Sequence, residues 1–315
     1  MAGEAAIVVR DLTRSFPGVK AVDRLSFEVR YGEIFGLVGP DGAGKTTTMR
    51  MLAAVLSPDS GAAQVAGFDV AREPERVKHD ISYMSQRFGL YEDLTVDENI
   101  RFYAEVFGVK KSAREERAGR LLDAADMKRF RTRLAGKLSG GMKQKLGLIC
   151  ALIHTPRVLL LDEPTNGVDP VSRRDFWKIL YSLLGEGVAI LASTAYLDEA
   201  ERCHRIALLH EGKLLFCDTP GALKQKLSNS VVSIVTVDAR SAAGAIKNIP
   251  GVHSAVLVGD GVHLLVDDAA KIIPSLRARM DAERLSYQSV DAVGASVEDV
   301  FVSAVEREME AQHER

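Results

Sequence analysis

A lysine and two threonines end a glycine-rich run, GPDGAGKTT, at residues 39–47. The run matches the pattern G-x-x-x-x-G-K-[ST], in which glycines let the backbone turn tightly and direct its N–H groups at phosphate oxygens. We predict that Lys45 reaches the β and γ phosphates of a bound nucleotide and that the Thr46 hydroxyl ligates Mg²⁺. The expected nucleotide contacts are Gly39, Pro40, Asp41, Gly42, Ala43, Gly44, Lys45, Thr46 and Thr47.

The segments on both sides of this run are those that a phosphate-binding loop needs. The apolar run EIFGLVG at 33–39 predicts a buried strand before the loop, and TTMRMLAAVL at 47–56 predicts a helix after it. The positive end of that helix would add to the attraction of phosphate. A glycine-rich turn with a surface lysine is the alternative, and the strand, loop and helix in register favour the phosphate site.

A second apolar run, RVLLLDEP at 157–164, ends in two acidic residues, Asp162 and Glu163. Open α/β sheets bind ligands at the carboxyl ends of their strands, which is where these acids would stand. We predict that Asp162 holds Mg²⁺ through water and that Glu163 orients or deprotonates an attacking water. Capping of a following helix is the alternative for this pair. Lys45 and Glu163 are thus candidate catalytic residues.

Apolar runs and amphipathic segments alternate from residue 1 to about 220, which is typical of an α/β domain with a largely parallel sheet. The run VAILAST at 188–194 predicts a third buried strand. Between about 88 and 155 the pattern becomes helical: Thr95 and Glu98 form a capping box, and a charged helix follows at 112–127. We expect an α/β domain with a parallel core and this helical insertion.

The rhythm changes after residue 220, and residues 228–315 predict a separate small domain. The expected order is strand, helix, two strands, helix, strand, which is typical of a ferredoxin-like α+β module. The turn Gly259-Asp260-Gly261 predicts a hairpin between its middle strands. A final helix, capped by Ser296, would complete this accessory or regulatory domain.

Composition limits the possible partners. The 315 residues carry a net charge of -2 with a pI near 6.4, so there is no strong basic field and we expect no nucleic-acid partner. Three cysteines without CxxC spacing indicate neither a disulfide framework nor a zinc site. No stretch is apolar enough to span a bilayer, and the N-terminus does not read as a signal peptide. We expect a cytoplasmic protein.

The stretch LSGGMKQKLGLICALIHTP at 138–156 narrows the choice among families of P-loop proteins. Ser139, Gly140 and Gly141 begin a predicted helix and would form a second anion site. With the P-loop and LLLDEPT at this spacing, the sequence resembles the ATPase subunits of ATP-binding cassette (ABC) transporters over residues 1 to about 220. The resemblance implies a P-loop ATPase cassette in which an N-terminal antiparallel β part joins the parallel core. It also implies a head-to-tail pair of cassettes, like or unlike, with ATP bound by the P-loop of one and sealed by Ser139 and Gly141 of the other.

Other positions take their expected roles from this resemblance. Phe16 would stack on adenine, with a core phenylalanine as the alternative. Gln86 would ligate Mg²⁺ or the attacking water and contact the membrane subunit, and Asp169 would communicate across the cassette pair, unless it is only the turn residue before Pro170. Met142 departs from the glutamine that many members carry after the two glycines.

The stretch AILASTAYLDEA at 189–200 holds a larger departure, because the family pattern places Ala195 where a histidine contacts the γ-phosphate. Losing one such donor costs about 3–4 kcal/mol, so we expect slowed hydrolysis. Pairing with a different cassette, replacement of the histidine by Tyr196 or His204, and a misalignment are the three explanations. Strand alternation predicts that Tyr196 points to the opposite face, and His204 is expected on a helix, which argues against the second explanation. The intact Lys45, Asp162 and Glu163 argue against a dead nucleotide site, so the first is favoured.

The motifs look most like cassettes of drug and antibiotic exporters of the daunorubicin-resistance type, with ASVEDVF at 295–301 as a short further match. This resemblance implies ATP hydrolysis that drives a separate transmembrane permease for drug or xenobiotic efflux. The chain would then lie peripherally on the inner face of the cell membrane. A soluble ATPase of the family acting on ribosomes or nucleic acid, and a nucleotide-gated regulatory module, are the alternatives.

Overall fold

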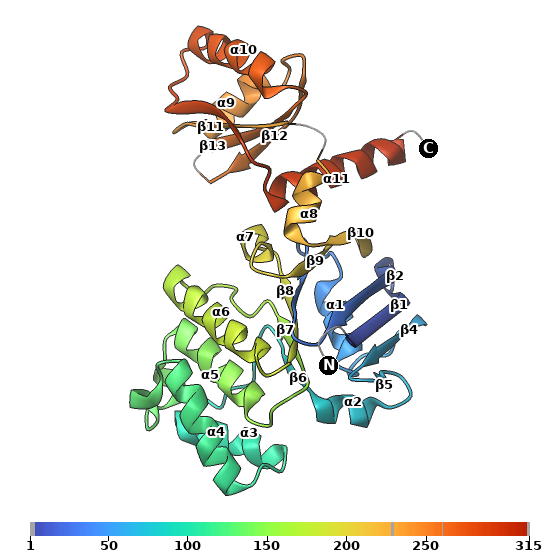
Figure 1. The fold of residues 1–315 in the computed structure, drawn as a ribbon, viewed down its shortest axis with the longest axis vertical. Helices are drawn as coiled ribbons and strands as arrows, with labels where there is room; N and C mark the ends of the chain where they lie inside the picture. The colour runs from blue at the N-terminus through green and yellow to red at the C-terminus, as the bar shows by residue number, and fades with distance from the viewer. Residues whose placement is uncertain (1–3, 228–229, 260, 314–315) are drawn as a thin grey trace. The chain divides into compact units, whose positions relative to one another are not determined.

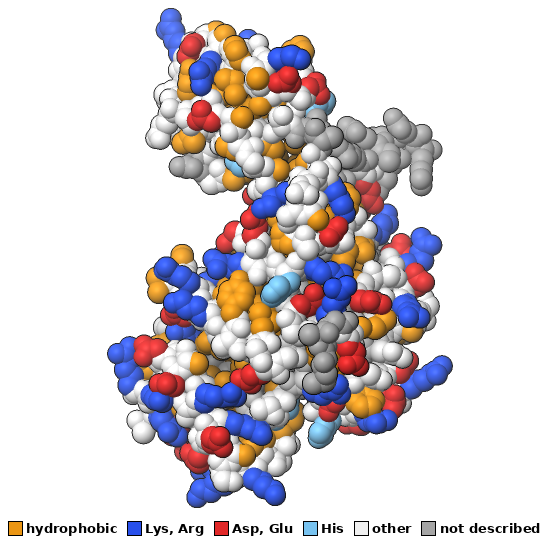
Figure 2. Space-filling view, in the orientation of Figure 1, with side chains coloured by type: hydrophobic (Ala, Val, Ile, Leu, Met, Phe, Trp, Pro, Cys, Tyr) orange, Lys and Arg blue, Asp and Glu red, His pale blue; other side chains and the backbone are white. Residues whose placement is uncertain are grey.

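The chain divides into two compact units, Met1–Cys217 and Asp218–Arg315, in the computed structural model (Figure 1). The structure describes residues 4–227, 230–259 and 261–313. Within these ranges no helix is both long and apolar enough to cross a membrane. On the face drawn in Figure 2, acidic and basic side chains are interspersed over the surface.

A six-stranded sheet forms the centre of the first unit, in the order β10-β9-β3-β8-β7-β6. Its strands are β3 (Ile34–Val38), β6 (Ile81–Met84), β7 (Val158–Asp162), β8 (Ala189–Thr194), β9 (Arg205–His210) and β10 (Lys213–Asp218). Every residue of β3, β7 and β8 is buried, which confirms the three predicted strands. Because β6, β7, β8, β3 and β9 are parallel neighbours, their carboxyl ends meet at one edge.

An antiparallel sheet of order β2-β1-β4-β5 forms the N-terminal part. Its strands are β1 (Ala5–Phe16), β2 (Val19–Arg30), β4 (Ser60–Val65) and β5 (Phe68–Asp69). Helix α1 (Lys45–Leu52) shares one apolar core with both sheets: Met49, Met51 and Leu52 are fully buried in it. The α/β cassette with an antiparallel part is therefore confirmed, and α1 is fixed from two sides.

Helices fill the remainder of this unit. They are α2 (Pro74–Asp80), α3 (Val96–Val106), α4 (Lys111–Ala124), α5 (Gly140–Leu152), α6 (Pro170–Leu184) and α7 (Leu197–Ala200), with short 3-10 turns at Lys128–Phe130 and Ala135–Lys137. The predicted capping box is present: Thr95 Oγ1 accepts from Glu98 N at 3.2 Å, and Glu98 Oε2 accepts from Thr95 N at 2.8 Å. The helices α5 and α6 lie on one side of the six-stranded sheet (Figure 1).

The second unit begins with α8 (Pro220–Gln225) and contains an antiparallel sheet of order β12-β13-β11-β14. Its other elements are β11 (Ser230–Val235), α9 (Ala239–Ile246), β12 (Val252–Val258), β13 (Gly261–Val266), α10 (Ala269–Ala282), β14 (Ser289–Val293) and α11 (Val297–His313). The element order and strand order are those of a ferredoxin-like fold, as predicted. β12 pairs with β13 as expected for a hairpin, although Asp260 of its turn lies outside the described residues.

Candidate active site

The glycine-rich loop joins the buried strand β3 to α1. Gly44 has φ of +95°, and a Cβ there would lie 2.3 Å from the backbone oxygen of Ala21, so only glycine is compatible with this turn. Helix α1 then begins at Lys45, and its N-cap makes no side-chain hydrogen bond. The first N–H groups of the helix therefore carry no side-chain cap and can serve an anion.

Lys45 lies folded over this loop. Its Nζ donates to the backbone oxygens of Gly39 at 2.8 Å and Pro40 at 3.0 Å. The same Nζ forms an ion pair with Glu163 Oε1 at 3.1 Å, and both side chains are buried. The loop thus holds a desolvated positive charge whose partners are carbonyls and one carboxylate, and phosphate oxygens are chemically suited to compete with them.

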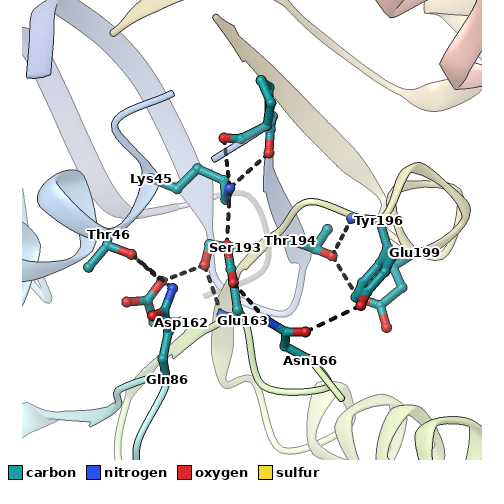
Figure 3. A network of polar contacts seen from close by, with 12 residues as sticks. Lys45, Thr46, Gln86, Asp162, Glu163, Asn166, Ser193, Thr194, Tyr196 and Glu199 are labelled. Atoms are coloured by element: carbon teal, nitrogen blue, oxygen red, sulfur yellow. Dashed lines mark hydrogen bonds and ion pairs between the residues drawn. The ribbon is translucent and has the colours of Figure 1, made fainter. Parts of the chain in front are cut away.

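Asp162 is the centre of a buried polar cluster at the ends of β7 and β8 (Figure 3). Its Oδ1 accepts from Thr46 Oγ1 at 3.1 Å and from Ser193 Oγ at 2.7 Å, and its Oδ2 accepts from Tyr83 at 3.3 Å. Burial and the adjacent Asp162 carboxylate raise the pKa of Tyr83 to about 12, so this phenol stays protonated and donates. Three hydroxyl groups therefore orient one carboxylate.

The side chains around Asp162 fit Mg²⁺. Gln86 Nε2 donates to Thr46 Oγ1 at 3.4 Å, so its amide lies beside this hydroxyl and the Asp162 carboxylate, and rotation of the amide would present its oxygen to a metal ion (Figure 3). Mg²⁺ prefers such oxygen donors, and it is usually held by one or two carboxylates together with substrate phosphates and water. In the part of the chain that the structure describes, no group of three or more His, Cys, Asp or Glu side chains forms a self-sufficient metal site.

Glu163 follows Asp162 in a strained backbone conformation, with φ of +49°. Its N–H donates to Ser193 Oγ at 2.9 Å, which fixes the turn to the end of β8. Its second carboxylate oxygen, Oε2, accepts from Asn166 Nδ2 at 3.3 Å. Lys45 on one oxygen and Asn166 on the other therefore set the orientation of the Glu163 carboxylate.

The serine-glycine segment begins a helix, as predicted. Ser139 caps α5 by accepting from Met142 N at 3.3 Å, and a Cβ on Gly141 would lie 2.4 Å from Ser172. Gly141 is thus required for the packing of α5 against α6. Among the described residues, no hydrogen bond or ion pair joins the segment Ser139–Gly141 to the glycine-rich loop of the same chain, so its expected contact with ATP stays a prediction.

Asp169 caps α6, where its Oδ1 accepts from the backbone N–H groups of Val171 and Ser172 at 3.1 and 2.9 Å. Hydrogen bonds from Ser172 hold the pKa of Asp169 below its usual value. Asp169 therefore has the local role of a turn residue before Pro170, which was the alternative from sequence. Its communication across a cassette pair stays a prediction.

Phe16 ends β1 with 43 % of its surface exposed, so the core alternative for this residue is wrong. The guanidinium of Arg14 lies 5.1 Å from the ring centroid. An exposed ring with a cation beside it is free to stack on a base, which is the predicted role.

Two predictions around Ala195 are wrong. Strand β8 ends at Thr194, so alternation does not extend to Tyr196, which is the N-cap of α7. Ala195 and Tyr196 line the same cavity of about 170 Å³, together with Glu163 and Asp41.

His204 lies beyond α7, not on a helix, and its Nδ1 accepts from the backbone N–H of Ile34 at the start of β3, the strand end remote from the loop. His204 therefore does not replace the histidine that the resemblance places at position 195.

A buried glutamate that the sequence analysis did not identify ties this region together. Glu199 is 1 % exposed and accepts from the hydroxyls of Thr165, which follows β7, and Thr194, the last residue of β8. Arg173 Nε of α6 lies 3.4 Å from Glu199 Oε1. The glutamate is preceded by Asp198 in the sequence, and the pair reads as an ordinary acidic helix start, so only tertiary contacts reveal its role.

We expect Glu199→Ala to lower the free energy of unfolding by about 3–5 kcal/mol, because it leaves two buried hydroxyls without their acceptor and Arg173 without the nearer of its two carboxylate partners. Urea unfolding followed by tryptophan fluorescence measures this, since Trp177 Nε1 lies 3.5 Å from the same carboxylate. Glu116→Ala, at an exposed position of α4, is the matched control and should change little. Equal stabilities of the two variants would contradict the role of Glu199.

Known proteins are similar to most of this chain. Residues 22–166 match the family described as ABC transporter. The probable multidrug ABC transporter ATP-binding protein YbhF of Escherichia coli is 46 % identical over 85 % of this chain, which spans only 47 % of that relative. The daunorubicin/doxorubicin resistance ATP-binding protein DrrA of Streptomyces peucetius is 35 % identical over 95 % of this chain and 92 % of its own length.

Solved structures agree with these relatives. The ATP-binding subunit of an ABC transporter superposes with a TM-score of 0.64 at 30 % identity, covering 70 % of this chain and 92 % of its own. The loop, the acidic strand end and the serine-glycine helix start all lie within the first unit, and the similarity to DrrA continues through the second. The chain belongs to the family of ABC transporter ATP-binding proteins.

Proposed function

We propose that this chain binds Mg²⁺–ATP at the loop 39–47 and hydrolyses it to drive a separate transmembrane permease that exports drugs or other xenobiotics. The observation that carries the proposal is the meeting of Lys45, Thr46, Asp162 and Glu163 at the carboxyl edge of one parallel sheet. These groups supply the phosphate clamp, the metal ligands and the base that phosphoryl transfer to water requires.

Each side chain has a distinct task in this reaction. Lys45 would exchange its carbonyl partners for the β and γ phosphate oxygens, while Thr46, Asp162 and Gln86 would hold the metal ion, directly or through water. Bound Mg²⁺ supplies charge neutralisation of the phosphates. Glu163, freed from Lys45, would accept a hydrogen bond from the attacking water and take its proton, and Phe16 would stack on adenine.

A second cassette would complete the site. Ser139 and Gly140 are exposed at the start of α5, with Gly141 buried behind them, and this helix start would face the phosphates bound by a partner chain, in a homodimer or a heterodimer. Asp169, exposed at the start of α6, would communicate across the pair. The second unit, Asp218–Arg315, would stabilise or regulate that pair. Such a complex would place this chain on the inner face of the membrane through its permease.

Ala195 would make hydrolysis slow at this site. It offers only a methyl group to the cavity beside Glu163, so no donor from this position can reach a phosphate or the attacking water. ATP binding relies on the loop and Lys45 and would persist.

Affinity purification of the tagged chain from its native membranes tests the assignment to a transporter. We expect multi-span permease subunits, and where the pair is unlike a second cassette, to purify with it in the presence of ATP. Recovery with ribosomes, or as an ATP-binding protein without any membrane subunit, would contradict it and favour the alternatives.

A further inference from the structure

Tyr196 belongs to the reacting end of the site. Its ring lines the cavity that Ala195 and Glu163 share, and its hydroxyl lies 3.2 Å from Asn166 Oδ1 (Figure 3). Asn166 Nδ2 in turn donates to Glu163 Oε2 at 3.3 Å. A continuous series of hydrogen bonds therefore connects the Tyr196 hydroxyl, next to Ala195, to the Glu163 carboxylate. Lys45 holds the other oxygen of that carboxylate.

The direction of this chain follows from the chemistry of its end. An ionised carboxylate can only accept, so Asn166 must turn its NH₂ group to Glu163 and its carbonyl oxygen away. A carbonyl oxygen also can only accept, so the Tyr196 hydroxyl is the donor. Rotation of the Asn166 amide would turn its carbonyl oxygen to the Glu163 carboxylate and break that bond, so the two contacts together select one orientation of the amide.

The ring of Tyr196 is itself held in place. The Arg173 guanidinium lies 4.5 Å from the ring centroid, and Arg173 is paired with the buried Glu199. The backbone N–H of Tyr196 donates to Thr194 Oγ1 at 3.0 Å, and that same hydroxyl donates to Glu199 at 2.8 Å. The phenol is therefore supported by both the end of β8 and helix α6.

We propose that Tyr196 is a positioning residue for ATP hydrolysis, whose hydroxyl acts through Asn166 to orient the Glu163 carboxylate. This inference rests on the proposed ATPase function. It explains how a site with Ala195 keeps an ordered base without a histidine donor. The phenol does not contact the phosphates in this arrangement, so the slowing attributed to Ala195 is only partly offset.

Steady-state ATP turnover of Tyr196→Phe tests the inference. The variant keeps the ring and its contact with Arg173 and loses only the hydroxyl. We expect kcat to fall about fivefold, as for loss of one neutral hydrogen bond, with KM for ATP and the urea midpoint unchanged. Tyr181→Phe is the matched control, because Tyr181 also loses a hydrogen bond, to the Arg202 carbonyl at 3.0 Å, outside the site; its kcat should not change.

A double-mutant cycle with Asn166→Ala separates positioning from a general structural effect. We expect Tyr196→Phe to have no further effect on kcat in the Asn166→Ala background, because the hydrogen bonds that connect Tyr196 to Glu163 are already lost. An equal fall in both backgrounds, or no fall in Tyr196→Phe while the wild type turns over, would overturn the inference alone. A wild-type chain that turns over no ATP, alone or with its partner, would overturn the proposed function and this inference with it.

Discussion

Glu163→Gln should abolish ATP turnover while ATP binding remains within a few-fold of the wild type. The amide keeps the size of the side chain and can still accept from Asn166, but it cannot take a proton from water. A general base contributes about 10²–10⁴ in rate, so we expect a fall of that order. Phosphate release measures turnover, and equilibrium dialysis with ATP measures binding.

The matched control for this variant is Glu116→Gln on the exposed face of α4, which should hydrolyse ATP as the wild type does. If Glu163→Gln retained most of the turnover, Glu163 would be only the counter-ion of Lys45, and the base would have to be sought elsewhere.

Ala195→His should raise turnover by up to about 10²–10³, the contribution of one preorganised donor at a centre where charge develops. Ala195 is exposed and lines a cavity of about 170 Å³, so an imidazole can enter without displacing the buried core. Turnover is to be measured with the chain alone and with its partner cassette, because a slow site within an unlike pair would be masked by a faster one.

Ala195→Leu separates chemistry from bulk in that experiment. Leucine adds side-chain volume to the cavity but no donor, so it should leave turnover at or below the wild-type level. A wild type as fast as Ala195→His, or an equal gain in Ala195→Leu, would show that the missing histidine does not limit the rate.

Short motifs with a local mechanism could be predicted from sequence, as could the strands that carry them. The loop at 39–47, the strand ends at Asp162 and Glu163, and the capping box at Thr95 each depend on residues close together in the chain. Their physical requirements are met by residue type and spacing alone. The ferredoxin-like order of strands and helices in the second unit can also be predicted, because its turns and its alternation of apolar and polar residues are regular.

The contacts that complete the site come from long-range packing and could not be predicted. Asn166 and Tyr196 are 30 residues apart and meet only because β7 and β8 are neighbours. Strand alternation predicts the wrong face for Tyr196 because β8 ends two residues earlier, at Thr194. The sequence marks Ser193 as a polar residue near the end of an apolar strand. Its hydrogen bonds with the Asp162 carboxylate and the Glu163 N–H are evident only in three dimensions.

Equilibrium titration of the purified chain with ATP, with and without Mg²⁺, tests the central claim most directly. Saturable binding of one ATP per chain that strengthens with Mg²⁺ is the result expected when Lys45 clamps the phosphates and Thr46 and Asp162 hold the metal. A chain that shows no measurable affinity for ATP with Mg²⁺ present would contradict the account.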